Sequence, residues 1–351
     1  MLEKFTWQLA GSDPLADEQV RQAVDQLADE RVSASAKADF LTALAKKGET
    51  PDEIAAFARA LRDKSVPPPI DPAWRDAREI LDVVGTGGDR LGTFNISTAA
   101  ALICAAAGIT VAKHGNRAVT SQAGSADVLE ALGVRIDLPP LDAVRSLRER
   151  QFAFFFAPAW HPAFKHIAPA RKLCAERGQR TIFNYLGPLL NPVRPSAMLV
   201  GVPRPGLCEP LAHVLQSLGV RRAMVVCGTV PSPESKVQSA IDELSTLGEN
   251  TIAEFYQERG FAASTLSPRQ FPLQPAALVD LLGGDKKQNA EIIRRIFRGE
   301  ERGPKRDAVL LNAAAALFVA GKTKSLADGW NLAVETIDSG QADAKLAELA
   351  H

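Results

Sequence analysis

Apolar residues near the start of the chain recur at helical spacing. After an acidic start at Asp17 and Glu18, the apolar residues of the first clear helix recur every three or four positions. This is the pattern of a helix that buries one face. The apolar positions are Val20, Ala23, Val24 and Leu27. We predict that residues 1–64 form a helical domain.

A second helix start is marked at residues 50–53, which read Thr-Pro-Asp-Glu. Thr50 can cap the first turn, Pro51 suits the first helical position, and Glu53 completes a capping box. Residues 65–75 then contain a cluster of prolines, a composition that predicts a hinge, which we place at residues 65–79. The apolar stripe between the cap and the hinge is Ile54, Phe57, Ala58 and Leu61.

Beyond the hinge, the apolar pattern changes to short buried strands that alternate with helices. Strands are predicted at 80–84, 109–112, 152–157, 198–202 and 223–227, and helices at 97–107, 125–132 and 307–320. Such alternation is typical of an α/β domain with a largely parallel sheet. We therefore expect a small N-terminal helical domain (1–64) and a large α/β domain (80–351), some of whose helices pack with the first.

Composition places the chain among ordinary globular proteins. Of its 351 residues, 46% are hydrophobic and 23% are charged, which argues against extensive disorder. Lysine plus arginine equals aspartate plus glutamate at 41 each, so the chain lacks the basic excess of proteins that coat nucleic acid or anionic lipid. No segment has an apolar run long enough to span a membrane, and residues 1–5 carry no apolar signal core. We expect no nucleic-acid or membrane partner, reduced cysteines and a cytoplasmic location.

The segment richest in candidate chemistry is a glycine loop between a strand and a helix. Residues 82–89 read Asp-Val-Val-Gly-Thr-Gly-Gly-Asp, and residues 93–98 read Thr-Phe-Asn-Ile-Ser-Thr. Glycines let backbone N–H groups approach an anion closely, and a helix N-terminus adds a dipole and free donors. With the polar side chains of the following turn, this arrangement favours a phosphate site. The alternative is a structural turn that closes the strand onto the helix.

A second polar segment follows the next predicted strand and should lie at the same edge of the sheet. Residues 113–117 read Lys-His-Gly-Asn-Arg, with Ser121 and Ser125 after them. Lys113 and Arg117 can neutralise phosphates, the two serines can donate hydrogen bonds, and Asn116 can hold a polar group of a second substrate. The alternative is a solvated basic loop.

Taken in order along the chain, these motifs resemble those of the anthranilate phosphoribosyltransferase family. The similarity continues with His161-Pro162, Lys165-His166 and Pro169-Ala170-Arg171, and with residues 180–192, RTIFNYLGPLLNP. It covers nearly the whole chain. The resemblance implies the nucleoside-phosphorylase-like phosphoribosyltransferase fold and a homodimer. It also implies Mg²⁺-dependent transfer of the phosphoribosyl group of phosphoribosyl pyrophosphate (PRPP) to the amine of anthranilate, a step of tryptophan biosynthesis.

The resemblance further implies roles for particular residues, and we expect catalysis by positioning and electrostatics without a covalent intermediate. The expected catalytic residues are Lys113 and Asp89. The residues expected to meet anthranilate are Gly85, Asn116 and Arg171, with Arg171 facing its carboxylate. The expected metal ligands are Ser97, Asp242 and Glu243. The residues expected to bind PRPP are Gly85, Gly88, Asp89, Thr93, Asn95, Ile96, Ser97, Thr98, Lys113, Asn116, Ser121 and Ser125.

Two departures from the family pattern stand out. Where the family usually has glycine after the loop aspartate, this chain has Arg90, which could contact pyrophosphate or point outward. Where the family commonly has a short His-Gly stretch before the acidic pair, this chain has Cys227 and a longer segment, residues 229–240. The second departure could alter metal affinity, closure rate or the choice of acceptor.

Other interpretations of these residues stay open. One is an enzyme of the same fold, a phosphoribosyltransferase or phosphorylase, that acts on another aromatic acceptor. Another is a paralogue without turnover that binds nucleic acid or a regulatory ligand. Arg171 could be a surface cation, and His161 and His166 could be core or hinge residues. Trp160 is expected in core packing.

Overall fold

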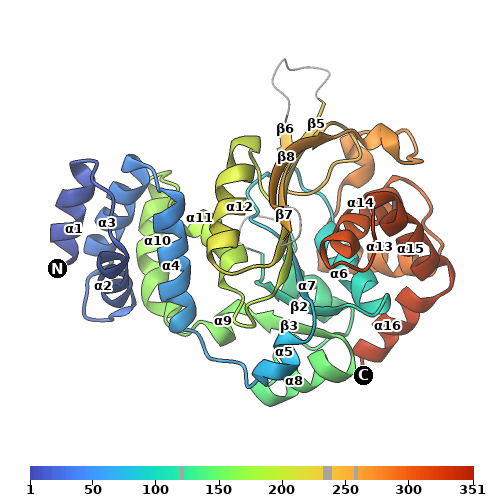
Figure 1. Cartoon of the computed structure of the whole chain (residues 1–351), viewed down its shortest axis with the longest axis horizontal. Helices are drawn as coiled ribbons and strands as arrows, with labels where there is room; N and C mark the ends of the chain where they lie inside the picture. Colours follow the sequence, from blue (N-terminus) through green and yellow to red (C-terminus); the bar gives the residue numbers. More distant parts are fainter. Residues whose placement is uncertain (119–121, 232–238, 257–259) are drawn as a thin grey trace.

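The computed structural model describes residues 1–118, 122–231, 239–256 and 260–351 (Figure 1). Helices α1 (Leu2–Ala10), α2 (Asp17–Ala28), α3 (Ala34–Lys47) and α4 (Pro51–Asp63) pack together at one end of the molecule. The predicted apolar stripe of α2 is fully buried among them. The expected hinge contains the short helix α5 (Pro72–Asp76), which begins at the last proline of the cluster and is capped by Asp71.

The start of α4 has the capping box that the sequence predicts. The Glu53 N–H donates to Thr50 Oγ1 at 3.1 Å, and the Thr50 N–H donates to Glu53 Oε2 at 2.9 Å. A side-chain cap of this kind stabilises a helix by about 1 kcal/mol. Glu53 is buried, and Lys47 Nζ lies 2.7 Å from its Oε2 atom. The pair therefore ties the end of α3 to the start of α4.

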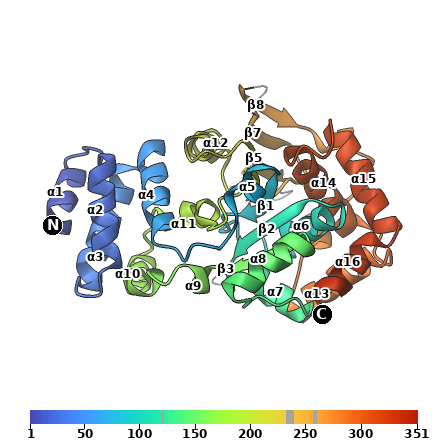
Figure 2. The same ribbon diagram turned by 60° about the horizontal axis from the view of Figure 1, so that its bottom comes forward.

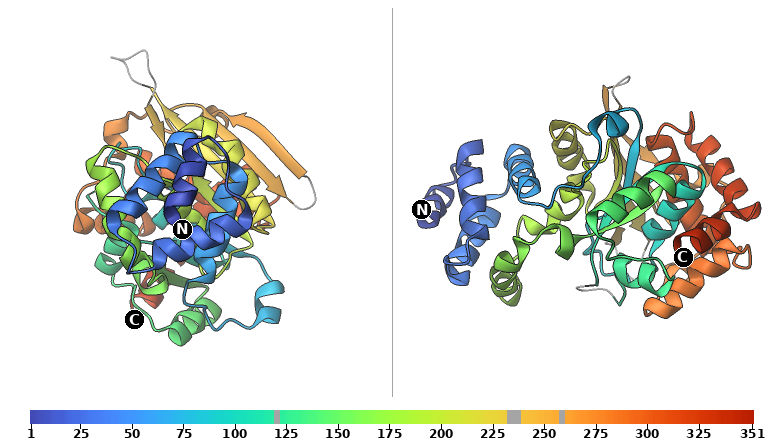
Figure 3. Two further views of the ribbon diagram at one scale, coloured as in Figure 1. Left: turned by 90° about the vertical axis from the view of Figure 1, so that its left-hand side faces the viewer. Right: turned by 90° about the horizontal axis from the view of Figure 1, so that it is seen from below.

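A later part of the chain completes the helical end of the molecule. Helix α10 (Phe164–Glu176) packs against α2 and α3, and α11 (Phe183–Leu186) lies between these helices and the sheet (Figure 1; Figure 3, right). Lys37 of α3 is buried, and its Nζ donates to the Asp29 carbonyl at 2.8 Å and to the His166 carbonyl at 2.9 Å. Segments far apart in sequence are thus joined at this end.

In the described residues the sheet has eight strands in the order β3-β2-β1-β4-β5-β7-β8, with β6 paired to β5. The sequence correctly predicts strands β1 to β5, which run parallel to one another. It does not predict the antiparallel strands β6 to β8; β8, for example, is largely exposed and has little apolar pattern. The sheet is therefore mixed. Its strands are β1 (Ile80–Gly85), β2 (Thr110–Gly115), β3 (Phe152–Phe156), β4 (Ala197–Gly201), β5 (Arg222–Val230), β6 (Ser239–Ile241), β7 (Asn250–Tyr256) and β8 (Gly260–Leu266).

Alternate residues of the central strands contribute to two different cores, as the two-residue period of a strand requires. Leu199 of β4 joins the core beneath one layer of helices, whereas Met198 and Val200 join the core shared with the helical end of the molecule. The first layer contains α6 (Ile96–Ala106), α13 (Lys286–Phe297), α14 (Pro304–Val319), α15 (Leu326–Asp338) and α16 (Gln341–Leu349) (Figure 2). The opposite face carries α12 (Cys208–Ser217).

The edge of the sheet at β3 has its own small core. Helix α8 (Pro140–Glu149) packs on β3, and Trp160, at the end of α9 (Ala157–Trp160), packs against Phe155 with ring centroids 4.9 Å apart. Trp160 is therefore a core residue, as expected. All four cysteines of the chain are buried and free. Among the described residues, no helix combines the length and the apolarity needed to cross a bilayer.

Candidate active site

The glycine loop leaves the carboxyl end of β1 with backbone conformations that suit glycine. Gly87 and Gly88 have φ angles of +75° and +91°, and Gly92 has +73°. The N–H groups of residues 88–90 donate to no acceptor in the described part of the chain. Consecutive free N–H groups in a loop of this kind form a concave site for an anion. The loop therefore presents backbone donors of the kind that an anion site needs.

The acidic pair Asp242-Glu243 follows β6 and packs against this loop, although it is far away in the sequence. The Gly87 N–H donates to Asp242 Oδ2 at 2.6 Å. The Ser97 N–H, in the first turn of α6, donates to Glu243 Oε1 at 3.2 Å. The fold thus brings together the three residues that were expected to hold a metal.

Glycines on three neighbouring strands make room for the acidic pair, and sequence reasoning missed two of them, Gly201 and Gly228. A Cβ atom at Gly85 would overlap the Asp242 carboxylate, and one at Gly201 would overlap the Asp242 carbonyl. At Gly228 a Cβ would come 2.7 Å from the Glu243 carbonyl oxygen. The signal was available, because β1, β4 and the predicted core of β5 each run into a glycine at the same edge of the sheet.

The electrostatics of the pair favour a bound cation. Burial raises the pKa of Asp242, and the nearby Asp89 carboxylate raises it further. Burial also raises the pKa of Glu243, with a further contribution from Asp242. A cation among these carboxylates would relieve their mutual repulsion. Two carboxylates and a hydroxyl are oxygen donors of the kind that Mg²⁺ prefers, so the residues fit that ion.

Lys113 lies inside the sheet and not on a loop, because β2 extends to Gly115, three residues beyond the predicted strand end. Only 1% of its surface is exposed, and its Nζ donates to the Val83 carbonyl at 2.5 Å. Burial lowers the pKa of Lys113, whereas Asp82 and Glu243 raise it. The ammonium group therefore approaches the acidic pair from within the sheet.

In the rest of the second polar segment, the structure differs from the expectation at Arg117. Ser125 Oγ donates to the carbonyl of Asn116 at 3.4 Å, and Asn116 itself is exposed. The Arg117 guanidinium does not face an open phosphate site, since it pairs with Asp127 at 2.9 Å and with Glu130 at 3.0 Å. Ser121 lies outside the described residues.

The first turn of α6 is held in place by its own polar side chains. Asn95 Nδ2 donates to the Ala123 carbonyl at 3.2 Å, and Asn95 Oδ1 accepts from Asn289 Nδ2 at 2.9 Å. Thr93 forms an isolated bridge with Leu282. The side chains of Ile96 and Thr98 are buried, and the Thr98 hydroxyl has no partner among the described residues.

Arg171 is exposed on α10, on the helical side of the molecule (Figure 1). Its guanidinium carbon lies 5.2 Å from the centre of the Phe183 ring, a cation–π distance. It forms no hydrogen bond or ion pair with the described residues. The group is therefore available to a ligand, and its stacking on Phe183 orients it.

A buried polar cluster that the sequence did not reveal joins β1, β2 and the residue that follows α9, His161. His161 Nε2 and His114 Nε2 lie 3.2 Å apart, and both side chains are buried. Asn191 Nδ2 donates to Asp82 Oδ2 at 2.9 Å and to the Ala112 carbonyl at 2.7 Å. The location assigns His161 to the core, at the junction of the sheet with the helical end.

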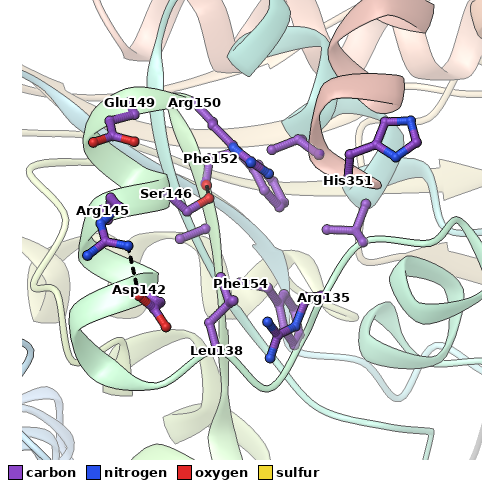
Figure 4. A pocket seen from close by; sticks show the side chains of 13 residues that line it. Arg135, Leu138, Asp142, Arg145, Ser146, Glu149, Arg150, Phe152, Phe154 and His351 are labelled. Carbon is purple, nitrogen blue, oxygen red and sulfur yellow. Dashed lines mark hydrogen bonds and ion pairs between the residues drawn. The ribbon is translucent and has the colours of Figure 1, made fainter.

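A separate cavity of about 260 Å³ opens at the amino end of β3, beside α8 (Figure 4). Phe152, Phe154 and Leu138 line it, and Arg145 at its rim pairs with Asp142 at 3.3 Å. None of the candidate site residues lines this cavity. The glycine loop follows the carboxyl end of β1. Since β1 and β3 run in the same direction, the cavity at the amino end of β3 lies at the opposite end of the strands.

Comparison with known families gives two matches that together span most of the chain. Residues 77–343 match a family described as "Glycosyl transferase family, a/b domain". Residues 7–65 match one described as "Glycosyl transferase family, helical bundle domain".

Individual relatives are similar over almost their whole length. The chain is 45% identical to an anthranilate phosphoribosyltransferase of Petrotoga mobilis, with 99% of this chain and 96% of the relative covered. It is 43% identical to one from a Geobacter species, with 99% and 98% covered.

Solved structures give the same picture. The anthranilate phosphoribosyltransferase of Thermus thermophilus is 42% identical with a TM-score of 0.86, covering 99% of this chain and 98% of that one. The Saccharomyces cerevisiae enzyme in complex with PRPP and Mg is 26% identical with a TM-score of 0.84, covering 99% and 96%.

Proposed function

The chain belongs to the anthranilate phosphoribosyltransferase family, and we propose that it transfers the 5-phosphoribosyl group of PRPP to the amine of anthranilate. The products are N-(5-phosphoribosyl)anthranilate and pyrophosphate. The observation that carries this proposal is the glycine loop, whose N–H groups at residues 88–90 have no acceptor in the described part of the chain and lie beside the acidic pair Asp242-Glu243. PRPP carries several phosphate groups and binds together with a divalent metal, so its site needs both N–H donors and carboxylates.

The proposed PRPP site is formed by the glycine loop, the first turn of α6 and the segment after β2. Its backbone N–H groups and hydroxyls would bind phosphate oxygens, and the helix N-terminus would add its dipole. Asn95 and Ile96 act by holding α6 against its neighbours. The residues that we assign to PRPP are Gly85, Gly88, Asp89, Thr93, Asn95, Ile96, Ser97, Thr98, Lys113, Asn116, Ser121 and Ser125.

For Mg²⁺ we propose Ser97, Asp242 and Glu243 as the protein ligands. Mg²⁺ usually keeps several waters and is held by one or two carboxylates plus substrate phosphates, so a partial set of protein oxygens is sufficient. When bound, the ion neutralises charge on the pyrophosphate. The positive charge of Lys113 lowers the pKa of Glu243 and so favours the ionised carboxylate, the form that binds a cation.

The reaction that these groups would assist is a single displacement at the ribose. The amine nitrogen forms a bond to C1 as the bond from C1 to the pyrophosphate oxygen breaks, and the electron pair leaves with the pyrophosphate. The new ammonium nitrogen then loses a proton to solvent. We assign Lys113 and Asp89 to the catalytic machinery, where they balance charge around the donor. No covalent enzyme intermediate is needed, because positioning two substrates side by side can lower a barrier by about 7–11 kcal/mol.

We assign Gly85, Asn116 and Arg171 to anthranilate. A guanidinium can pair with a carboxylate through two parallel hydrogen bonds, and the one on Arg171 has no competing partner among the described residues. The α10 helix is part of the helical end of the molecule, whereas Gly85 and Asn116 belong to the α/β part. The acceptor would therefore bind between the two.

The first test is a steady-state assay that follows the loss of anthranilate fluorescence in the presence of PRPP and Mg²⁺. We expect Arg171→Ala to raise the KM for anthranilate about tenfold or more, because a charged hydrogen-bond pair is lost, and to leave the KM for PRPP within about twofold. Lys172→Ala is the matched control, since Lys172 is the next residue on α10 and is exposed.

Two outcomes would contradict the assignments. An unchanged KM for anthranilate in Arg171→Ala would remove Arg171 from the acceptor site. Turnover of PRPP with another aromatic amine, and none with anthranilate, would favour the interpretation as a related enzyme with a different acceptor.

We also propose a homodimer and a cytoplasmic location. Helix α1 presents Trp7, whose exposed fraction of 79% is high for a residue of this size and kind. A second copy of the chain could cover it. Four free, buried cysteines are typical of a reducing compartment.

A further inference from the structure

Arg90 has an unusual backbone conformation for its residue type. It follows the loop aspartate with a φ angle of +61°, in the left-handed region that glycine adopts without steric cost. Its side chain is exposed and forms no hydrogen bond or ion pair with the described residues. Strained backbone positions of this kind cluster at functional sites. Packing gives no reason for an arginine here, so a ligand contact becomes the natural explanation.

The charges around the loop indicate which ligand. The carboxylates of Asp89, Asp242 and Glu243 lie beside the glycine loop, which we propose as the anion site. The other two cations that the sequence places near the site, Lys113 and Arg117, already contact neighbouring protein groups. Lys113 is inside the sheet and donates to the Val83 carbonyl, and Arg117 is paired with two carboxylates of α7 (Ser125–Ala131).

Arg90 is therefore the cation that the loop itself supplies. Its own N–H is one of the three consecutive N–H groups that lack an acceptor in the described part of the chain. The backbone N–H and the guanidinium of Arg90 can therefore bind the same anion. A guanidinium presents its donors as a planar fork that matches two phosphate oxygens.

We propose that the Arg90 guanidinium binds the pyrophosphate group of PRPP and stabilises it as it leaves. The inference rests on the proposed function and adds to it a contact that this chain makes with arginine in place of glycine. As the bond from C1 to oxygen breaks, negative charge grows on the pyrophosphate, and the fixed positive charge lowers the energy of that state. Arg90 exchanges no proton, because a guanidinium stays protonated throughout the working pH range.

The test measures binding of pyrophosphate itself, by calorimetry of the full-length protein with Mg²⁺ present and without it. We expect Arg90→Gln to raise the Kd for pyrophosphate about tenfold or more, and the KM for PRPP in parallel, because a charged hydrogen bond is lost. Arg90→Lys should stay within about threefold of the natural protein, since it keeps the charge. The KM for anthranilate should not change.

Two further variants separate charge from backbone strain. Arg90→Gly relieves the left-handed conformation while removing the charge, so we expect it to bind pyrophosphate as weakly as Arg90→Gln. Arg135→Gln makes the same change in net charge at an exposed arginine, whose nearest carboxylate is Asp137 at 3.7 Å, and should bind pyrophosphate as the natural protein does.

Equal pyrophosphate affinity in Arg90→Gln, Arg135→Gln and the natural protein would overturn the inference and show that the side chain only points into solvent. That result would leave the proposed function standing if the natural protein still consumed PRPP and anthranilate. Absence of any turnover by the natural protein would instead count against the proposed function, whatever Arg90 binds.

Discussion

At the scale of single residues, the main feature of the molecule is a set of ionisable groups buried where the sheet meets the helical end. Burial raises the pKa of Asp82 to about 6, and it lowers the pKa of His114 to about 3 and that of His161 to about 4. The positive charges of Arg62 and Lys113 act in the same direction on His114. The fold therefore favours the neutral form of all three groups. Protonation at acidic pH places a charge on the buried histidines, whereas it removes the charge of Asp82.

The sign of the pH dependence follows from these shifts. For the two histidines the folded pKa lies below the unfolded value of about 6.5, so their contribution to stability falls as the pH drops from about 6.5 to 4. For Asp82 the folded pKa lies above the unfolded value of about 3.9, so its contribution rises as the pH drops from about 6 to 4. The two contributions oppose each other, and Asp242 and Glu243, whose pKa values burial also raises, act in the same direction as Asp82.

His161→Gln should remove the part of this dependence that His161 contributes. We expect the slope of the unfolding free energy against pH, between pH 6.5 and 4, to become less positive by up to about 1.4 kcal/mol per pH unit, the value for one proton. Urea denaturation at a series of pH values measures it. His213→Gln, at an exposed position of α12, is the control and should keep the natural slope. An unchanged slope in His161→Gln would show that His161 is not the group responsible.

At the scale of elements, the site depends on strands that end in glycine at one edge of the sheet. Gly85 pairs with Gly201 across β1 and β4, and the turn that carries Asp242 and Glu243 lies against both strand ends. Any side chain at these positions would push the acidic pair away from the glycine loop. The two hydrogen bonds that join the pair to Gly87 and Ser97 would then be lost. Strand ends, and not only the loop, therefore position the acidic pair that we propose as metal ligands.

Gly201→Ala tests this dependence on strand ends. Because the new Cβ would overlap the backbone carbonyl of Asp242, we expect a loss of stability of about 1–3 kcal/mol and an at least tenfold weaker affinity for Mn²⁺ used as a probe for Mg²⁺. Urea denaturation and metal titration measure the two effects. Gly206→Ala is the matched control, since a Cβ there would meet nothing within 4 Å. If Gly201→Ala bound the metal as tightly as Gly206→Ala, the crowding would be unimportant.

At the scale of the whole molecule, the proposed acceptor residues come from both ends of the structure. Arg171 lies on α10, which packs against α2 and α3, while Asn116 follows β2 in the sheet. The buried Lys37 bonds α3 to the carbonyl of His166 on α10, so the helices at this end are connected to one another. A movement of the helical end relative to the sheet would carry Arg171 with it. The outer surface of this end, at α1, is where we place the contact between two copies.

The proposed dimer contact leads to a prediction about assembly. We expect the natural protein to have twice the mass of one chain in solution, and Trp7→Lys to shift it toward the monomer, because a charge replaces a large exposed aromatic side chain. Light scattering after size-exclusion chromatography measures the mass. Leu141→Lys, at a residue of α8 that is 70% exposed, is the control and should leave the mass unchanged. A dimer that survives Trp7→Lys would place the interface elsewhere.

The sequence by itself determined the features that depend on near neighbours in the chain. The stripe of α2, the capping box of α4, the parallel strands β1 to β5 and the glycine conformations of the loop after β1 all follow from local spacing and residue type. These features could be predicted because helix and strand periods, caps and glycine conformations involve only a few consecutive residues. The order of several such motifs also identified the family.

Only the tertiary structure decided which distant groups meet. Gly87 and Asp242 are 155 residues apart, and no local pattern shows that one bonds the other. The longer β2 placed Lys113 inside the sheet, and α7 supplied the two carboxylates that pair with Arg117. Burial and charge pairing are set by packing between remote segments, and packing is what converts a list of polar residues into a site with particular pKa values and free donors.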